Sequence, residues 1–371
     1  MFELVHPGWS KGLEGRTLES RPSLKDMSID ELRGFFISMG EEGYRAEQVM
    51  SWMYRHGVRS FSEMTNLSKS LRDRLAQKAS LDDPQVLARR DSRDGYATKY
   101  LVGLRDGNAV ETVVLRYSYG TSICISTQVG CRMACRFCAS ALGGFVRNLT
   151  AGEMMNQILV AQGGFGGEGD RITHIVLMGS GEPLDNYVET LKFIRLAHHP
   201  QGFGIGYRRI TVSTCGLVPG IDRLAGEGIP VTLSVSLHAP DDGLRDRLVP
   251  VNRVYPLREL IPACARFVDR TGRRITFEYV LLAGINDAPR DARRLAARLE
   301  GLVAHVNLIP FNPVRGKANK RPSAEAVDVF RSVLEEEGVS CTVRRELGLD
   351  IDAACGQLRR RYGEDTQGFG E

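Results

Sequence analysis

The sequence contains no long hydrophobic run and no secretory leader. No stretch approaches the roughly 18 consecutive apolar residues that a membrane-spanning helix needs. Residues 1–20 mix charge, glycine and proline and lack the apolar segment of a signal peptide. We therefore expect a cytoplasmic protein with no membrane partner. In that reducing compartment, the eight cysteines are better suited to metal binding or chemistry than to structural disulfides.

Internal repeats and low-complexity segments are also absent, and the charge is not strongly of one sign. Of the 371 residues, 42% are hydrophobic and 25% are charged, which is typical of a globular protein. The net charge of +4 permits a polyanionic partner without requiring one, so the local arrangement of charge has to decide. The length accommodates one large domain and a smaller one.

The N-terminal quarter has the pattern of a small helical domain. Residues 1–25 show no periodicity and are expected to form a flexible arm. Residues 26–96 carry three short apolar stripes at helical spacing, which predict a helical accessory domain. The first helix should begin at Ser28, because Glu31 stands three residues later, as in a capping box.

Beyond residue 97 the pattern changes to strands and helices in alternation. Residues 97–116 are predicted to be linking strands, and residues 117–350 an α/β core. Six strands alternate with six helices in this core, which implies a parallel sheet with right-handed crossovers. Periodicity alone fits either an open sheet or a partial barrel, and in both folds ligands bind at the carboxyl ends of the strands. The expected strands are 122–126, 172–178, 209–213, 231–237, 275–281 and 305–310, and the expected helices are 151–162, 187–197, 219–225, 257–269, 288–299 and 324–336.

Three cysteines, Cys131, Cys135 and Cys138, follow the first core strand at the spacing C-x3-C-x2-C. Three thiolates can hold a four-iron cluster and leave one iron without a protein ligand. That iron can bind the amino and carboxylate groups of S-adenosylmethionine, whose cleavage then yields a 5′-deoxyadenosyl radical. The alternative is a structural zinc site. Zinc prefers four closed ligands, and no fourth cysteine or histidine stands nearby at zinc spacing.

This motif and several other segments resemble the radical S-adenosylmethionine superfamily and, within it, the RlmN/Cfr family of RNA methyltransferases. The superfamily resemblance covers residues 117–350, and the family resemblance spans nearly the whole chain. It implies that the core is a partial six-unit (β/α) barrel, followed by a C-terminal segment at 351–371 that carries a catalytic cysteine. The resembling segments are 44–48 (YRAEQ), 64–68 (MTNLS), 124–131 (CISTQVGC), 178–184 (MGSGEPL), 236–239 (SLHA), 310–313 (PFNP) and 350–358 (DIDAACGQL).

The resemblance also implies a reaction. The finer match is to members that methylate carbon 2 of an adenosine in 23S rRNA and tRNA, with a [4Fe-4S] cluster and two equivalents of S-adenosylmethionine per turnover. Carbon 2 of adenine is electron-poor and reacts badly with a sulfonium methyl group, so a radical route is needed. Cys355 is implied to accept the methyl group first, by the nucleophilic displacement to which a thiolate is suited.

Two further residues receive roles from the resemblance. After the methyl carbon on Cys355 has added to adenine as a radical, Cys124 is implied to resolve the protein–RNA adduct by forming a transient disulfide with Cys355. Glu111 is implied to accept the adenine proton, a task that suits a positioned carboxylate. We expect Glu111 to lie in an edge strand, where a glutamate is usually solvated.

The S-adenosylmethionine site is implied in the same way. Its residues stand at or just beyond the ends of expected strands, where this architecture gathers ligand contacts. The remaining cysteines, Cys215, Cys264 and Cys341, have no partner spacing and are expected to be structural. The implied S-adenosylmethionine contacts are Gly181, Glu182, Ser213, Ser236, Leu237, His238 and Asn312.

RNA binding would have to come from local clusters of basic residues. Each cluster alone fits a solvated surface, but two of them bracket Cys355 and together they favour a polyanion. The expected partners are RNA (23S rRNA and tRNA) and a reductant such as flavodoxin, and the protein is expected to be a monomer. The clusters are Arg89, Arg90 and Arg93; Arg315, Lys317, Lys320 and Arg321; Arg344 and Arg345; and Arg359, Arg360 and Arg361.

Three alternatives remain open from the sequence. A Cfr-type enzyme methylates carbon 8 of adenine with the same paired cysteines, and the motifs hardly separate it from a carbon-2 enzyme. A glycyl-radical activating enzyme shares the C-x3-C-x2-C spacing but has no use for Cys124 and Cys355. An RNA-binding protein with a structural metal is the non-enzyme alternative.

Overall fold

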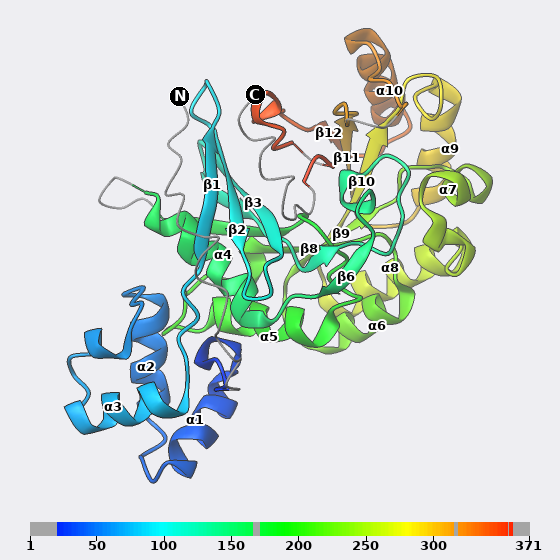
Figure 1. Cartoon of the computed structure of the whole chain (residues 1–371). Helices are drawn as coiled ribbons and strands as arrows, with labels where there is room; N and C mark the ends of the chain where they lie inside the picture. Colours follow the sequence, from blue (N-terminus) through cyan, green and yellow to red (C-terminus); the bar gives the residue numbers. More distant parts are fainter. Residues whose placement is uncertain (1–20, 166–170, 315–317, 355, 359–371) are drawn as a thin grey trace.

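The computed structural model describes residues 21–165, 171–314, 318–354 and 356–358 (Figure 1). The first 20 residues of the expected arm lie outside this part. Ordered structure starts before residue 26, because Leu24 is fully buried in the 3-10 helix η2 (Leu24–Asp26). No helix in the described ranges is long and apolar enough to cross a membrane.

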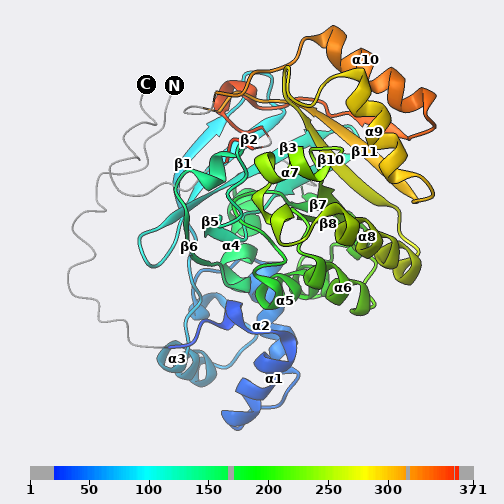
Figure 2. The same ribbon diagram turned by 90° about the vertical axis from the view of Figure 1, so that its right-hand side faces the viewer.

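Three short helices form the N-terminal domain, which lies below the rest of the molecule in both views (Figures 1 and 2). They are α1 (Ile29–Ser38), α2 (Arg45–Tyr54) and α3 (Lys69–Lys78), with η3 (Phe61–Glu63) between the last two. The predicted capping box is confirmed: Ser28 Oγ accepts the Glu31 N–H at 3.2 Å, and the Glu31 carboxylate accepts the Ser28 N–H at 2.6 Å.

Buried polar contacts hold this domain against the core. Lys25 Nζ donates to Asn156 Oδ1 of α4 (Ala151–Gly163) at 3.0 Å and to the carbonyl oxygen of Asp82 at 2.7 Å. The Asp26 carboxylate accepts the N–H of Gly152 in the first turn of α4 at 3.1 Å. The start of α4 is therefore anchored on the helical domain.

A ten-stranded sheet runs through the molecule in the order β1-β2-β3-β4-β7-β8-β9-β10-β11-β12. Strands β1 to β4 pair antiparallel, whereas all pairs from β4 to β12 are parallel. A separate hairpin, β5 (Gln128–Gly130) with β6 (Phe145–Asn148), follows β4. The strands of the large sheet are β1 (Gln85–Asp91), β2 (Ala97–Gly103), β3 (Ala109–Tyr117), β4 (Gly120–Cys124), β7 (Ile172–Leu177), β8 (Ile210–Thr214), β9 (Thr232–Ser236), β10 (Ile275–Leu281), β11 (Ala304–Pro310) and β12 (Cys341–Val343).

The connections between the parallel strands are helical, and the helices lie along the outside of the curved sheet (Figure 2). This is the partial (β/α) barrel that the resemblance implied. All six predicted core strands and all six predicted core helices are present. With α4, the crossover helices are α5 (Tyr187–His198), α6 (Val218–Gly226), α7 (Asp242–Leu248), α8 (Leu257–Thr271), α9 (Pro289–Leu299) and α10 (Ala324–Glu336).

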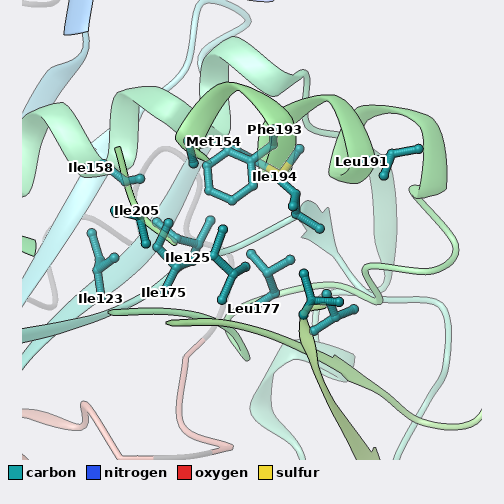
Figure 3. Packing of buried hydrophobic residues seen from close by; sticks show 14 of the residues in the cluster. Ile123, Ile125, Met154, Ile158, Ile175, Leu177, Leu191, Phe193, Ile194 and Ile205 are labelled. Carbon is teal, nitrogen blue, oxygen red and sulfur yellow. The ribbon is translucent and has the colours of Figure 1, made fainter. Parts of the chain in front are cut away.

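The alternation of side chains along each strand separates the core from the site. Ile123 and Ile125 are fully buried on the outer face, in the core against the helices, whereas Cys124 between them belongs to a different cluster on the inner face. Figure 3 shows this outer packing, in which residues of the β4 region and β7 meet α4 and α5. The labelled residues there are Ile123, Ile125, Met154, Ile158, Ile175, Leu177, Leu191, Phe193, Ile194 and Ile205.

Candidate active site

The carboxyl ends of the parallel strands surround a cavity that encloses about 920 Å³, its open mouth included. Cys131, Cys135 and Cys138 line one side of it. Six of the seven predicted S-adenosylmethionine contacts also line it, and these are Gly181, Glu182, Ser213, Ser236, His238 and Asn312. The structure therefore brings the sequence-predicted cofactor residues together in one place.

The three cysteines lie on the loop that joins β5 to β6. Gly130 begins this loop at φ +76°, and a Cβ atom there would lie only 1.7 Å from the Gly144 carbonyl oxygen. The backbone at the start of the loop is thus in contact with the backbone at its end. The Cys131 N–H donates to that same carbonyl oxygen at 3.2 Å. Within the described ranges, no three His, Cys, Asp or Glu side chains converge on a single metal ion.

The chemistry of the cysteine site fits an iron–sulfur cluster. Burial raises the pKa of the Cys131 thiol to about 12 and raises that of Cys135 further. A bare thiolate is therefore disfavoured, whereas a cationic metal cluster would neutralise its charge. Three thiols around one cavity, with polar ligand contacts opposite them, match the donor set of a cluster that keeps one iron open.

Glu182 is buried at the wall of the cavity, just beyond β7. Its carboxylate accepts the N–H groups of Cys215 at 2.8 Å and Leu184 at 3.1 Å. Burial nevertheless raises the pKa of this carboxyl. Gly181 before it has φ +113°, and a Cβ atom there would lie 2.6 Å from Thr127 Oγ1. Glycine therefore permits the close approach of the β7 loop to the chain that leads into β5.

His238 is a neutral imidazole in the cavity wall. Its Nδ1 accepts the N–H of Val280 at 3.0 Å, so the ring proton lies on Nε2. Burial lowers its pKa to about 3. Its ring stands edge-on to that of Phe137, with 4.7 Å between centroids. Leu237 differs from its neighbours: its side chain is fully buried in the hydrophobic core, so it can offer the cavity only backbone groups.

A second pocket adjoins the first, and both are lined by Met178, Ile309, Asn312 and Arg344. Cys124 lies in this second pocket, 7% exposed, beside Ala353, Ala354 and Leu358 of the C-terminal segment. Cys355 itself lies outside the described residues. Its neighbours Ala354 and Gly356 line the second and first pocket respectively.

The C-terminal segment is also bonded to the cysteine loop. The N–H of Ala139 donates to the carbonyl oxygen of Gly356 at 2.8 Å, and Ser140 Oγ donates to that of Leu358 at 2.7 Å. Both donors follow Cys138 directly. Segments more than 200 residues apart in the sequence thus meet at the site.

Glu111 is not in an edge strand, and the expectation that it is solvated is wrong. It lies in β3, between β2 and β4, and is 1% exposed. Its Oε1 is 3.4 Å from Nζ of Lys99, which also donates to the carbonyl oxygen of Asp352 at 3.1 Å. Glu111 lines neither pocket described above, but it shares its sheet face with Val113, which packs with Cys124.

Sequence reasoning missed Arg245, which is fully buried in α7. Its guanidinium donates to the carbonyl oxygens of Cys215, Ser236 and Leu237 at 2.6 to 3.1 Å and to Asn252 Oδ1 at 2.8 Å. It therefore fixes the backbone at the ends of β8 and β9. A single arginine in an amphipathic helix gives no sequence signal for such a role. Cys215, expected to be structural only, lines the cavity.

Some arginines of the predicted basic clusters are paired with carboxylates, whereas Arg345 is exposed over an aromatic ring. Arg89 is paired with Asp91, and Arg321 with Glu346. Arg345 is exposed and lies over the ring of Tyr96, 5.0 Å from its centroid. The cluster members Arg315, Lys317, Arg359, Arg360 and Arg361 lie outside the described residues.

Comparison with known proteins defines the class. Residues 125–296 match the model of the radical SAM superfamily, and residues 23–81 match the ribosomal RNA large subunit methyltransferase N-terminal domain. A crystal structure of a radical SAM methyltransferase from Sphaerobacter thermophilus superposes with a TM-score of 0.86 at 46% identity, covering 91% of this chain and 99% of that one. The chain is thus a radical SAM enzyme, and the superfamily's cofactors are a [4Fe-4S] cluster and S-adenosylmethionine.

Curated relatives define the family. A protein of Desulforamulus reducens is 52% identical over 94% of this chain and 98% of its own length. One of Pelotomaculum thermopropionicum is 55% identical over 92% of both chains. Each is named probable dual-specificity RNA methyltransferase RlmN. The chain belongs to the RlmN family.

Proposed function

We propose that this chain methylates carbon 2 of an adenosine in 23S rRNA and in tRNA. The observation that carries the proposal is the position of Cys124. It lies in a pocket lined by Ala354, next to Cys355, and this pocket adjoins the cavity of the three loop cysteines. A methyl-carrying cysteine, a resolving cysteine and a radical source are all needed in one place, and the proposal assigns them to Cys355, Cys124 and this cavity.

Three residues of the chain have separate roles in the reaction. Cys355 accepts a methyl group through its sulfur, and Cys124 releases the finished RNA by forming a disulfide with Cys355. Glu111 takes the adenine proton. Lys99 Nζ lies 3.4 Å from its Oε1 and holds the carboxylate in place, and a positioned carboxylate suits the removal of a proton.

Cys131, Cys135 and Cys138 would hold the cluster, which supplies the electron for cleaving S-adenosylmethionine. The walls of the cavity orient and enclose the substrate. The Glu182 carboxylate and the Ser213 and Ser236 hydroxyls provide polar contacts, and the neutral His238 offers an Nε2 proton donor. Burial of Glu182 and His238 excludes water from this part of the cavity wall.

The proposal includes a cellular setting. RNA is the substrate, a flavodoxin-type reductant delivers electrons, and the enzyme acts as a monomer in the cytoplasm. The seven cysteines within the described ranges are all free thiols, which is compatible with a reducing compartment.

Replacing Cys124 by Ala tests the proposal. The variant should still become methylated on Cys355 but should stop at a covalent protein–RNA adduct, visible as a shifted band after denaturing electrophoresis. Cys355→Ala should abolish RNA methylation while S-adenosylmethionine binding persists. Cys341→Ala, in the outermost strand β12, is the matched control and should turn over normally. Normal turnover by Cys124→Ala would refute the two-cysteine mechanism.

The carbon-8 alternative is separated by the product. Mass spectrometry of nucleosides from modified RNA should give 2-methyladenosine. Detection of 8-methyladenosine as the main product would instead establish a Cfr-type activity. The family to which the chain belongs favours carbon 2.

A further inference from the structure

A stacked aromatic pair lies at the amino end of β4, and neither ring is among the residues that line the cofactor cavity. Tyr117 and Tyr119 stack with 4.9 Å between ring centroids and 8° between ring planes. Tyr119 is 65% exposed, the highest fraction among the large hydrophobic residues in the described ranges. Two stacked rings that reach from a pocket to the surface offer an aromatic surface on which a further flat ring can stack.

The pair is connected to the catalytic pocket. Tyr117 lines the pocket that contains Cys124, and it packs with the hydrophobic cluster around that cysteine. Tyr119 lies outside this pocket, so the two stacked rings lead from the pocket to the surface. A group that is bound against Tyr119 is therefore placed next to whatever enters beside Cys124.

The turn that carries Tyr119 is held rigidly. Gly120 has φ +137°, and a Cβ atom there would lie 2.4 Å from Thr173 Oγ1, so the turn lies close against β7. Thr173 Oγ1 donates to the carbonyl oxygen of Thr121 at 3.0 Å. The Tyr119 ring also contacts His174 of β7, with 5.4 Å between ring centroids and 86° between ring planes. The exposed face of Tyr119 is thus preorganised, and little entropy is lost on stacking.

Positive charge accompanies the aromatic face. Arg344 lines the same pocket as Tyr117. Arg345 beside it lines the pocket and is exposed to solvent. An aromatic face with adjoining arginines is the combination that binds unpaired nucleic acid, since bases stack on the ring while guanidinium groups bind phosphates.

We propose that Tyr119, supported by Tyr117, is a stacking platform for an unpaired RNA base next to the target adenosine, and that Arg345 binds an adjoining phosphate. The proposal rests on the proposed function, because it assumes an RNA substrate. It adds the requirement that the target adenosine is presented in an unpaired segment, with a neighbouring base displaced onto the protein.

The test compares Tyr119→Ala, Tyr119→Phe and Tyr119→Leu with the intact enzyme. The probe is a fluorescein-labelled transcript of tRNA, with Kd from fluorescence anisotropy and with KM and kcat from methyl incorporation. Loss of one base stack should raise Kd and KM about 10- to 100-fold in Tyr119→Ala. Tyr119→Phe should keep nearly full affinity, and Tyr119→Leu should resemble Tyr119→Ala because it keeps apolar bulk but not the ring.

The possible results distinguish a failure of the stacking-platform proposal from a failure of the proposed function. Methylation of Cys355, measured by mass spectrometry without RNA, should stay normal in all three variants. Wild-type affinity in Tyr119→Ala or Tyr119→Leu, or an equal loss in Tyr119→Phe, would overturn the platform. An intact enzyme that never modifies RNA would overturn the proposed function instead. Val329→Ala, on the exposed side of α10, is the surface control.

Arg345→Gln tests the proposed phosphate contact. This variant should reduce the slope of log K against log salt by about one.

Discussion

Lys99 and Glu111 form an ion pair on adjacent strands with only 1% of either side chain exposed. Because both side chains are removed from solvent and Nζ lies 3.4 Å from Oε1, the two charges compensate each other in a low dielectric. Because Lys99 also donates to the carbonyl oxygen of Asp352, the pair connects the sheet to the segment that carries Cys355.

Lys99→Met should destabilise the protein strongly. It leaves the Glu111 carboxylate buried without its cation, which typically costs about 3–5 kcal/mol. Urea unfolding followed by circular dichroism measures this loss. The double variant Lys99→Met/Glu111→Leu should regain most of the stability, because both buried charges are gone, but not the methylation activity. An equally unstable double variant would show that the pair is not the source of the effect.

Gly130→Ala should abolish cluster binding while the barrel still folds. The new Cβ would meet the Gly144 carbonyl oxygen, and the positive φ is unfavourable for alanine, so the loop with the three cysteines has to open. Iron content after anaerobic reconstitution should fall to background. Gly226→Ala is the control, because a Cβ atom there has open space in α6. Full iron content in Gly130→Ala would contradict the proposed position of the cluster.

Arg245→Lys should weaken S-adenosylmethionine binding even though the charge is kept. A lysine cannot reproduce the four donor directions toward Cys215, Ser236, Leu237 and Asn252, so backbone carbonyl groups at the cavity lose their partners. We expect Kd by calorimetry to rise about 5- to 150-fold, which corresponds to a loss of about 1–3 kcal/mol. Arg331→Lys on the surface of α10 should leave Kd unchanged.

Because of Lys25, the free energy of unfolding should rise with pH in the alkaline range. Burial lowers its pKa from 10.5 to about 8 in the folded protein. Between these values the unfolded chain binds more protons than the folded one, so the free energy of unfolding increases as the pH rises from about 8 to 10.5. The total gain is on the order of 3 kcal/mol. Denaturant unfolding of the protein and of Lys25→Met at several pH values isolates this contribution, and parallel pH curves would contradict it.

Much of the barrel could be predicted because its signals are local. The bounds of β10 (Ile275–Leu281) and α10 (Ala324–Glu336) agree with the sequence prediction to the residue. An apolar run defines the first, and the Ser323 cap with an amphipathic stripe defines the second. The cofactor residues were implied by the family resemblance, and their positions agree with the rule that ligand contacts gather at the carboxyl ends of parallel strands.

The features that escaped prediction depend on contacts between distant segments. Nothing near Glu111 in the sequence indicates Lys99 as its partner, and the strand order that buries both is a property of the whole sheet. The hairpin of β5 and β6 was also missed. Its strands are only three and four residues long and flank the cysteine loop, whose metal-binding pattern dominates the sequence there.

The bonds from Ala139 and Ser140 to the C-terminal segment have a consequence for biosynthesis. Ser140 and Leu358 are 218 residues apart, and at 5–20 residues per second the ribosome needs roughly 10–45 s to make that interval. During this time the loop with the three cysteines has already been translated, while the segment that accepts its hydrogen bonds does not yet exist. Iron delivery to a nascent chain would meet a loop without these two hydrogen bonds, and completion of translation would supply them.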